Sequence, residues 1–237
     1  MILKGHRALV TGGTRGIGRA IAIALKQAGA DVLITGTQEN TKVPPGYQYE
    51  AVDFSDEKFS KLFFGKIKKS DFTILINNAG INKIAPFSEI SSKDYENIQR
   101  INMRAPFLLS QAVLPAMRKK KWGRIINMAS VFGVVSREFR ASYSVSKFGL
   151  DGMTAALAAE VAKEGILVNT VSPGFIDTEL TRSVLGEEGM REMAARIPMK
   201  RLGKPEEIAK LVCWLVSPEN TYISGQNIII DGGFTRV

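Results

Sequence analysis

Short apolar stretches rich in β-branched residues recur along the chain and predict buried strands. They lie at residues 7–11, 31–35, 49–53, 72–77, 124–129, 167–172 and 227–231. Stretches such as Thr73-Ile74-Leu75-Ile76 show no polar alternation, so both faces of the sheet should be covered. Most segments between the strands have helical spacing, as in Ile208, Leu211, Val212 and Leu215. Strands alternating with helices predict an α/β fold with a doubly wound parallel sheet of seven strands and helices on both faces.

One connection departs from this alternation. Residues 37–48 read TQENTKVPPGYQ, and Pro44, Pro45 and Gly46 break any helix there. The helix between the second and third strands should therefore be short or absent. Since no linker or internal repeat divides the chain, residues 1–237 should form a single Rossmann-type domain.

Composition narrows the classes of function. The 32 Lys and Arg against 23 Asp and Glu give a net charge of +9, which suits an anionic cofactor or an acidic partner. The only cysteine, Cys213, and the only histidine, His6, exclude a disulfide framework and a multi-histidine metal site, so we expect no metal. The basic residues are not interleaved with aromatics, which argues against nucleic-acid binding. No apolar run is long enough to span a membrane and the first residues lack a signal peptide, which predicts a cytoplasmic protein without membrane contact.

A glycine-rich turn follows the first strand and precedes an apolar helix. Its spacing, G-x3-G-x-G over residues 11–18, lacks the G-K-[ST] ending of a P-loop. Glycines let backbone N–H groups approach a pyrophosphate at the positive end of the helix dipole. The alternative is a tight turn whose glycines only permit packing. The functional interpretation makes this a dinucleotide site formed by Gly12, Thr14, Arg15, Gly16, Ile17 and Gly18.

The end of the second strand indicates which dinucleotide binds. A carboxylate there would hydrogen-bond the ribose 2′-hydroxyl of NAD, but the strand ends Ile34-Thr35-Gly36-Thr37 and the first acid is Glu39. Arg15 could pair with a 2′-phosphate, although it could equally be a solvated loop charge. The sequence thus predicts NADPH rather than NADH.

Candidate catalytic residues lie where a parallel sheet presents its functional edge. Ser130 follows the strand at 124–129, and Tyr143 and Lys147 are one turn apart at the start of a helix. An adjacent ammonium should lower the pKa of the tyrosine, which could then donate a proton to a carbonyl that receives hydride, with Ser130 holding the oxygen. Tyr and Lys at this spacing also occur by chance on many helices. The serine and the glycine-rich turn make the catalytic interpretation stronger.

Taken together, these motifs resemble the short-chain dehydrogenase/reductase family over essentially the whole chain. The shared features are residues 11–18, Asn77-Asn78-Ala79-Gly80, Asn102, Ser130, Tyr143-x-x-x-Lys147 and Pro173-Gly174. The resemblance implies an NAD(P)-dependent oxidoreductase acting on CH–OH groups. It also implies that Asn102 holds a water that connects Lys147 to solvent. The remaining cofactor contacts that it implies are those of Thr37, Asp53 at the adenine, Asn78 and Lys147 at the riboses, Ala79, Gly80, Pro173, Gly174, and Ile176 and Thr178 at the carboxamide.

Within the family, the strongest resemblance is to 3-oxoacyl-[acyl-carrier-protein] reductases of fatty-acid biosynthesis. An acidic carrier protein would suit a chain of charge +9. The candidate docking patch consists of Arg118, Lys119, Lys120, Lys121 and Arg124. The alternative is that these cations only complement the dipole at the end of a helix and otherwise lie in water.

Two residues fit this substrate poorly. Glu164 stands where such reductases often have a basic residue, and Arg140 stands where they usually have an uncharged one. Arg140 could bind a carboxylate or phosphate of a small polar ketone or alcohol from another biosynthetic pathway, or it could turn outward with Arg137 and Glu138. A further alternative is a non-catalytic nucleotide-sensing protein, although the catalytic residues are all present.

The resemblance also implies a lid and an assembly. Residues 177–198 would cap the substrate pocket, with Leu180, Val184, Leu185, Met190 and Met193 as its apolar underside. Family members commonly form homotetramers through the helices equivalent to residues 92–117 and 144–163 and through the last strand, so we expect a homotetramer.

Overall fold

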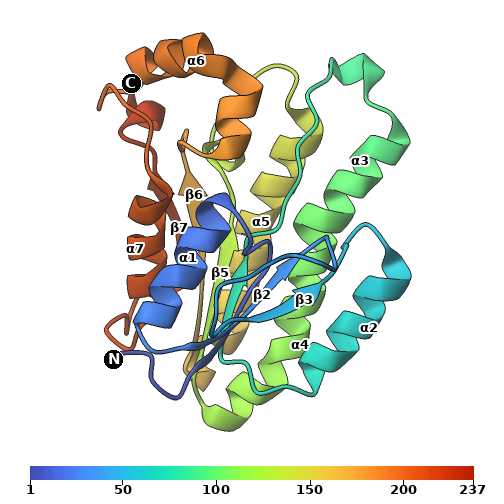
Figure 1. The fold of residues 1–237 in the computed structure, drawn as a ribbon, viewed down its shortest axis with the longest axis vertical. Helices are drawn as coiled ribbons and strands as arrows, with labels where there is room; N and C mark the ends of the chain where they lie inside the picture. The colour runs from blue at the N-terminus through green and yellow to red at the C-terminus, as the bar shows by residue number, and fades with distance from the viewer.

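The computed structural model describes residues 1–237 apart from the side chain of Val184, so the prediction for that side chain lies outside the described residues. All seven predicted strands form, and they pair in parallel in the order β3-β2-β1-β4-β5-β6-β7 (Figure 1). The predicted doubly wound parallel sheet is confirmed. The strands are β1 (Arg7–Val10), β2 (Asp31–Gly36), β3 (Gln48–Ala51), β4 (Ile74–Asn77), β5 (Gly123–Met128), β6 (Ile166–Pro173) and β7 (Asn227–Ile230).

Helices cover both faces of the sheet because its central strands are apolar on both sides. One core packs α1 and α7 against side chains such as Val10 and Ile34, and the other packs α2, α4 and α5 against Leu9 and Leu75. The burial of both sets is the main stabilising term of the fold. The helices are α1 (Gly16–Gln27), α2 (Glu57–Lys68), α3 (Ser92–Gln99), α4 (Ala105–Lys120), α5 (Ala141–Val161), α6 (Glu179–Arg196) and α7 (Pro205–Leu215).

The connection between β2 and β3 contains no helix, as the prolines predict. Residues 37–47 form an irregular segment, and Val43 and Tyr47 pack against the core beside α1. The phenol of Tyr49 on β3 donates a hydrogen bond to the carbonyl of Gln38 and holds the start of the segment. Two apolar side chains thus cover the surface that a helix would otherwise cover.

The carboxyl ends of the strands meet at one end of the molecule, next to α6 (Figure 1). The glycine-rich turn, Ser130 and Pro173 lie at the ends of β1, β5 and β6. The last turn of α4 lies at the opposite end. Among the described residues, no helix combines the length and apolar character needed to cross a membrane.

Candidate active site

Ser130, Tyr143 and Lys147 come together at the carboxyl end of β5. Ser130 is the second residue after β5, and its Oγ accepts the backbone N–H of Phe132 at 3.2 Å. Tyr143 and Lys147 lie on the first turns of α5, with the lysine Nζ 5.4 Å from the centre of the tyrosine ring. The predicted grouping of these three residues therefore exists in the structure.

Lys147 is held by the backbone of the neighbouring strand. Its Nζ donates a hydrogen bond of 2.7 Å to the carbonyl of Met128, and the residue is only 4% exposed. Burial lowers the pKa of Lys147 to about 8, because a charged amine loses hydration in the interior. The amine is thus poised to change protonation state near neutral pH.

The pKa of Tyr143 differs from the expectation. Burial raises it above the ordinary value, while the Ser130 hydroxyl and the charge of Arg140 act in the opposite direction. The side chains of the protein therefore do not give a net lowering of the Tyr143 pKa, and Arg140 is the neighbouring cation that contributes to its value.

Asn102 lies in a π-helical turn, Arg100–Arg104, between α3 and α4. Its amide donates to the Ile81 carbonyl at 2.9 Å and to Ser146 Oγ at 3.0 Å, and its oxygen accepts the Ile81 N–H at 2.9 Å. Ser146 in turn donates to the backbone carbonyl of Tyr143. Asn102 therefore ties the loop after β4 to the helix that carries the tyrosine, and one lone pair of its oxygen remains for the water that the resemblance implies.

The glycine-rich turn is shaped to receive a phosphate group. Gly12 and Gly16 have φ of +63° and +53°, a region that favours glycine. A Cβ on Gly18 would lie 2.2 Å from the carbonyl oxygen of Gly12, so only glycine allows the turn to pack this closely on α1. The first turn of α1 contains no acidic residue. These features fit a dinucleotide pyrophosphate at the positive end of α1.

The loop after β4 connects this turn to the amine of Lys147. Thr11 Oγ accepts the N–H groups of Asn78 and Ala79, and the Asn78 amide donates to the carbonyls of Thr11 and Gly12. A Cβ on Gly80 would lie 3.6 Å from Lys147 Nζ. The predicted cofactor residues 78–80 thus form the floor between the two halves of the site, and Asn78 braces the turn.

The remaining predicted cofactor residues lie on either side of this floor. Arg15 is exposed just before α1, and Thr37 and Asp53 are exposed after β2 and β3. On the other side, β6 ends at Pro173 and is followed by Gly174 and Ile176. Thr178 caps α6 by accepting the N–H of Thr181, and its Cγ2 is 3.6 Å from the Cβ position of Gly16. Thr178, at the start of α6, therefore lies beside the glycine-rich turn.

Sequence reasoning placed Thr11 in the glycine-rich motif without giving it a role of its own, and it missed two supporting residues, Phe132 and Ser146. The roles of these two residues depend on partners distant along the chain or on the fold of a loop, so no motif marks them. Phe132 lies under the guanidinium of Arg140, whose carbon is 5.6 Å from the ring centre. This contact shows that Arg140 faces inward rather than pairing outward with Glu138.

The candidate docking patch needs a correction. Arg124 is only 5% exposed and donates to the carbonyls of Gly123, Gly165 and Asn220, so it is not available to a partner protein. Arg118 forms ion pairs with Glu160 and Glu164. The lysines at 119–121 remain exposed, although Lys120 lies 3.8 Å from a carboxylate oxygen of Asp71. The six residues of β5, about 20 Å of strand, separate them from Ser130.

Comparison with known proteins places the chain in a family. The model for "Enoyl-(Acyl carrier protein) reductase" matches residues 12–235. A 3-oxoacyl-[acyl-carrier-protein] reductase FabG of Aquifex aeolicus is 41% identical over 243 residues, 98% of each chain.

Solved structures similar to this chain share its fold but are named as dehydrogenases of a different substrate. A Beutenbergia cavernae protein with bound NADP, provisionally assigned as an NAD(P)-dependent gluconate 5-dehydrogenase, superposes with a TM-score of 0.92 at 33% identity, covering 99% of this chain and 98% of that one. A gluconate 5-dehydrogenase of Burkholderia cenocepacia, in complex with NADP and tartrate, has a TM-score of 0.90 at 29% identity, covering 99% and 97%. With the site geometry, these similarities show that the chain belongs to the short-chain dehydrogenase/reductase family and is an NAD(P)-dependent oxidoreductase acting on CH–OH groups.

Proposed function

We propose that this protein reduces the ketone of 3-oxoacyl thioesters carried by acyl carrier protein, with NADPH as the reductant. The observation that carries the proposal is the meeting of Ser130, Tyr143 and Lys147 beside the floor formed by residues 78–80. A bound nicotinamide supplies the hydride.

The side chains supply the rest of the reaction. Ser130 donates a hydrogen bond to the ketone oxygen and orients it toward Tyr143. Tyr143 transfers its phenolic proton to that oxygen as negative charge develops there. Lys147 stabilises the resulting phenolate through its charge, and Asn102 keeps the loop at Ile81 and α5 in register. We propose that α6, with the rest of residues 177–198, covers the reactants and excludes water.

Several observations support NADPH over NADH. The end of β2 offers Thr37 in place of a carboxylate that would repel a phosphate, and Arg15 is exposed beside the glycine-rich turn. A guanidinium there can form charge-assisted hydrogen bonds with a 2′-phosphate. We therefore assign Arg15 and Thr37 to the 2′-phosphate.

The curated relative supports a carrier-bound substrate, and the gluconate dehydrogenases favour a small polar one. The second candidate function is therefore reduction of a small anionic ketone. The position of Arg140 against Phe132, beside Tyr143, is the observation that favours it. For the carrier protein, our proposed contact remains the exposed lysines at 119–121. We also propose that the enzyme is cytoplasmic.

The proposal is tested by following NADPH oxidation with acetoacetyl-acyl carrier protein and with a carrier-free acetoacetyl thioester. Tyr143→Phe should lower kcat by at least about 10³-fold, since the proton donor is lost, while NADPH affinity measured by fluorescence stays within a few-fold. The matched control, Tyr95→Phe, changes an exposed tyrosine on α3 and should have little effect. Near-normal turnover of Tyr143→Phe would reject the assigned role. Equal kcat/KM for free and carrier-bound thioesters would reject carrier-protein docking.

A further inference from the structure

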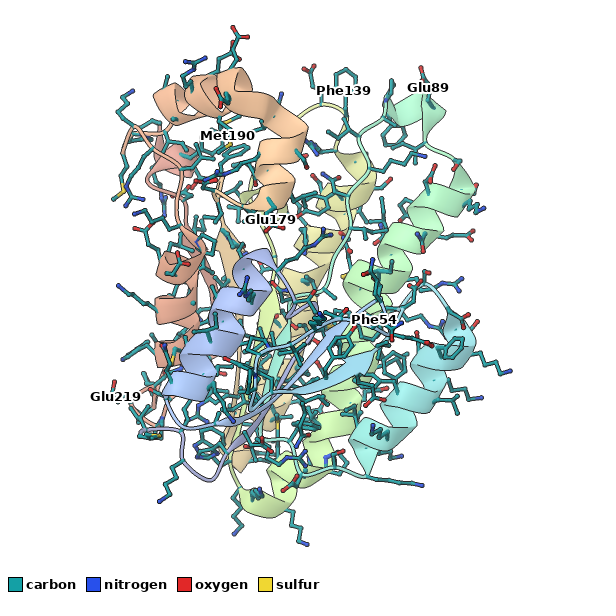
Figure 2. The ribbon with its side chains drawn as sticks, in the orientation of Figure 1. Phe54, Glu89, Phe139, Glu179, Met190 and Glu219 are labelled. Carbon is teal, nitrogen blue, oxygen red and sulfur yellow. The ribbon has the colours of Figure 1, made fainter. Side chains whose placement is uncertain are left out.

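A cation lies beside the reacting residues. Arg140 immediately precedes α5, three residues before Tyr143. Its guanidinium lies over the Phe132 ring, and the backbone N–H of that phenylalanine is hydrogen-bonded to Ser130 Oγ. Figure 2 places the preceding residue, Phe139, at the same end of the molecule as Glu179 and Met190 of α6. Arg140 therefore lies against the turn that carries the serine.

The surface beneath Arg140 is braced. Phe132 makes an edge-to-face contact with Phe175, with centroids 6.0 Å apart, and Phe175 makes another with Phe234 at 5.2 Å. Such contacts hold aromatic rings in fixed orientations. The loop is also tied to its neighbour, because the N–H of Ala85 donates to the carbonyl of Phe139 at 3.3 Å. The guanidinium is thus positioned before any substrate arrives.

Arg140 differs from two arginines near this end of the molecule that are held in ion pairs, and it differs from the exposed Arg137 of its own loop in being half-buried. Arg182 is paired with Asp177 and Arg201 with Glu207, whereas no described carboxylate forms an ion pair with Arg140. Its side chain is half-buried, unlike those of the exposed residues 135–139. Burial and the charge of Arg137 lower the pKa of Arg140. A partly desolvated guanidinium without a counter-ion is unfavourable, and an incoming anion relieves that cost.

We propose that Arg140 binds the carboxylate of a small keto acid whose ketone lies between Ser130 and Tyr143, so that the enzyme reduces keto acids to hydroxy acids as a further activity. Arginine binds a carboxylate in a bidentate manner with N–O distances of about 2.8 Å, which fixes the plane and the direction of the substrate. Because Arg140 and Tyr143 belong to adjoining turns, the ketone and the carboxylate should be only a few atoms apart.

The reaction balances with the groups already described, and the inference therefore rests on the proposed function. The hydride of NADPH adds to the carbonyl carbon, the C=O π electrons move to oxygen, and the phenolic proton of Tyr143 joins that oxygen. The products are the hydroxy acid, NADP⁺ and a phenolate that regains its proton from water. The carboxylate does not react and serves only to hold the substrate.

The test compares each keto acid with its uncharged primary amide. With 2-oxobutanoate, 3-oxobutanoate and 4-oxopentanoate, wild type should favour at least one acid over its amide in kcat/KM. Arg140→Gln should lower this acid-to-amide ratio by about 10- to 100-fold, the range expected for a lost charge-assisted hydrogen bond. Any effect of Arg140 on the Tyr143 phenol influences both substrates and cancels in the ratio.

Two variants serve as controls. Arg140→Lys should restore part of the ratio, because the charge remains and the bidentate geometry does not. Arg137→Gln removes an exposed cation from the same loop and should leave the ratio unchanged. An unchanged ratio in Arg140→Gln overturns the inference. So does a wild type that reduces thioesters but prefers no acid over its amide. Failure to reduce either class overturns the proposed function itself.

Discussion

At the residue scale, the burial that lowers the pKa of Lys147 also destabilises the folded state. The folded pKa of about 8 is below the ordinary value of 10.5, so the unfolded chain binds more protons at this position. The charged amine therefore weakens the fold at pH 7, and this loss diminishes as the pH rises above about 8. Its hydrogen bond to Met128 offsets part of the loss.

This pKa predicts the pH dependence of turnover. As the pH rises through about 8, Lys147 loses its proton and with it the charge that stabilises the Tyr143 phenolate. kcat/KM for an uncharged ketone should fall by up to about tenfold per pH unit above that point. Lys147→Arg should lack this decrease, even at lower absolute activity, because a guanidinium stays protonated. Initial rates in buffers of constant ionic strength measure both profiles, and an identical decrease in the variant would exclude Lys147 as its origin.

The sequence predicted the relation of Tyr143 to Lys147 because a spacing of four on a helix fixes a common face. It could not decide the direction of Arg140, because a residue just before a helix can face either way. That direction depends on Phe132, whose ring position follows from the fold of the intervening loop. The direction of the Tyr143 pKa shift could not be predicted from the sequence either, because burial raises this pKa while Ser130 and Arg140 lower it.

At the element scale, the strands were predictable because buried parallel strands are continuously apolar. The missing helix between β2 and β3 was predictable from its prolines. The π-helical turn at Asn102 was not, because one extra residue in a helical pattern leaves the spacing of apolar residues almost unchanged. How Val43 and Tyr47 cover α1 depends on long-range packing that no local pattern encodes.

Arg15, at the start of α1, should determine the preference for NADPH over NADH. Arg15→Ala should raise the KM for NADPH at least about tenfold and the KM for NADH less than threefold, since only NADPH carries a 2′-phosphate. Lys26→Ala, in the last turn of the same helix, is the matched control and should change neither value. Steady-state rates with each nucleotide at saturating ketone measure the effect. Equal losses for both nucleotides would mean that Arg15 does not discriminate between them.

At the scale of the whole molecule, one surface is unusually apolar for an isolated chain. A groove of about 880 Å³ runs between α3, α4 and α5, and Met103, Phe107, Leu114, Met153 and Leu157 are among the residues that line it. Phe107 and Phe148 are 49% and 46% exposed. Exposed apolar patches of this kind commonly mark interfaces between chains. The groove supports our proposal that the protein is a homotetramer that pairs partly through α4 and α5.

Light scattering coupled to size-exclusion chromatography tests this assembly. Wild type should elute at four times the chain mass of 25.9 kDa. Phe107→Glu should yield smaller species, because a charge buried at an apolar contact is strongly unfavourable. Phe59→Glu changes a phenylalanine of 62% exposure on α2, outside the groove, and should keep the wild-type mass. A wild-type protein that is monomeric in solution would contradict the proposed homotetramer.

The contact between Thr178 and Gly16 has a kinetic consequence. Thr178, the cap of α6, lies next to the backbone that would carry the pyrophosphate, so we expect a dinucleotide extended toward Lys147 to pass beneath the start of α6. We therefore expect nucleotide exchange to require displacement of this segment. On this view the dinucleotide is the first to arrive and the last to depart in each catalytic cycle.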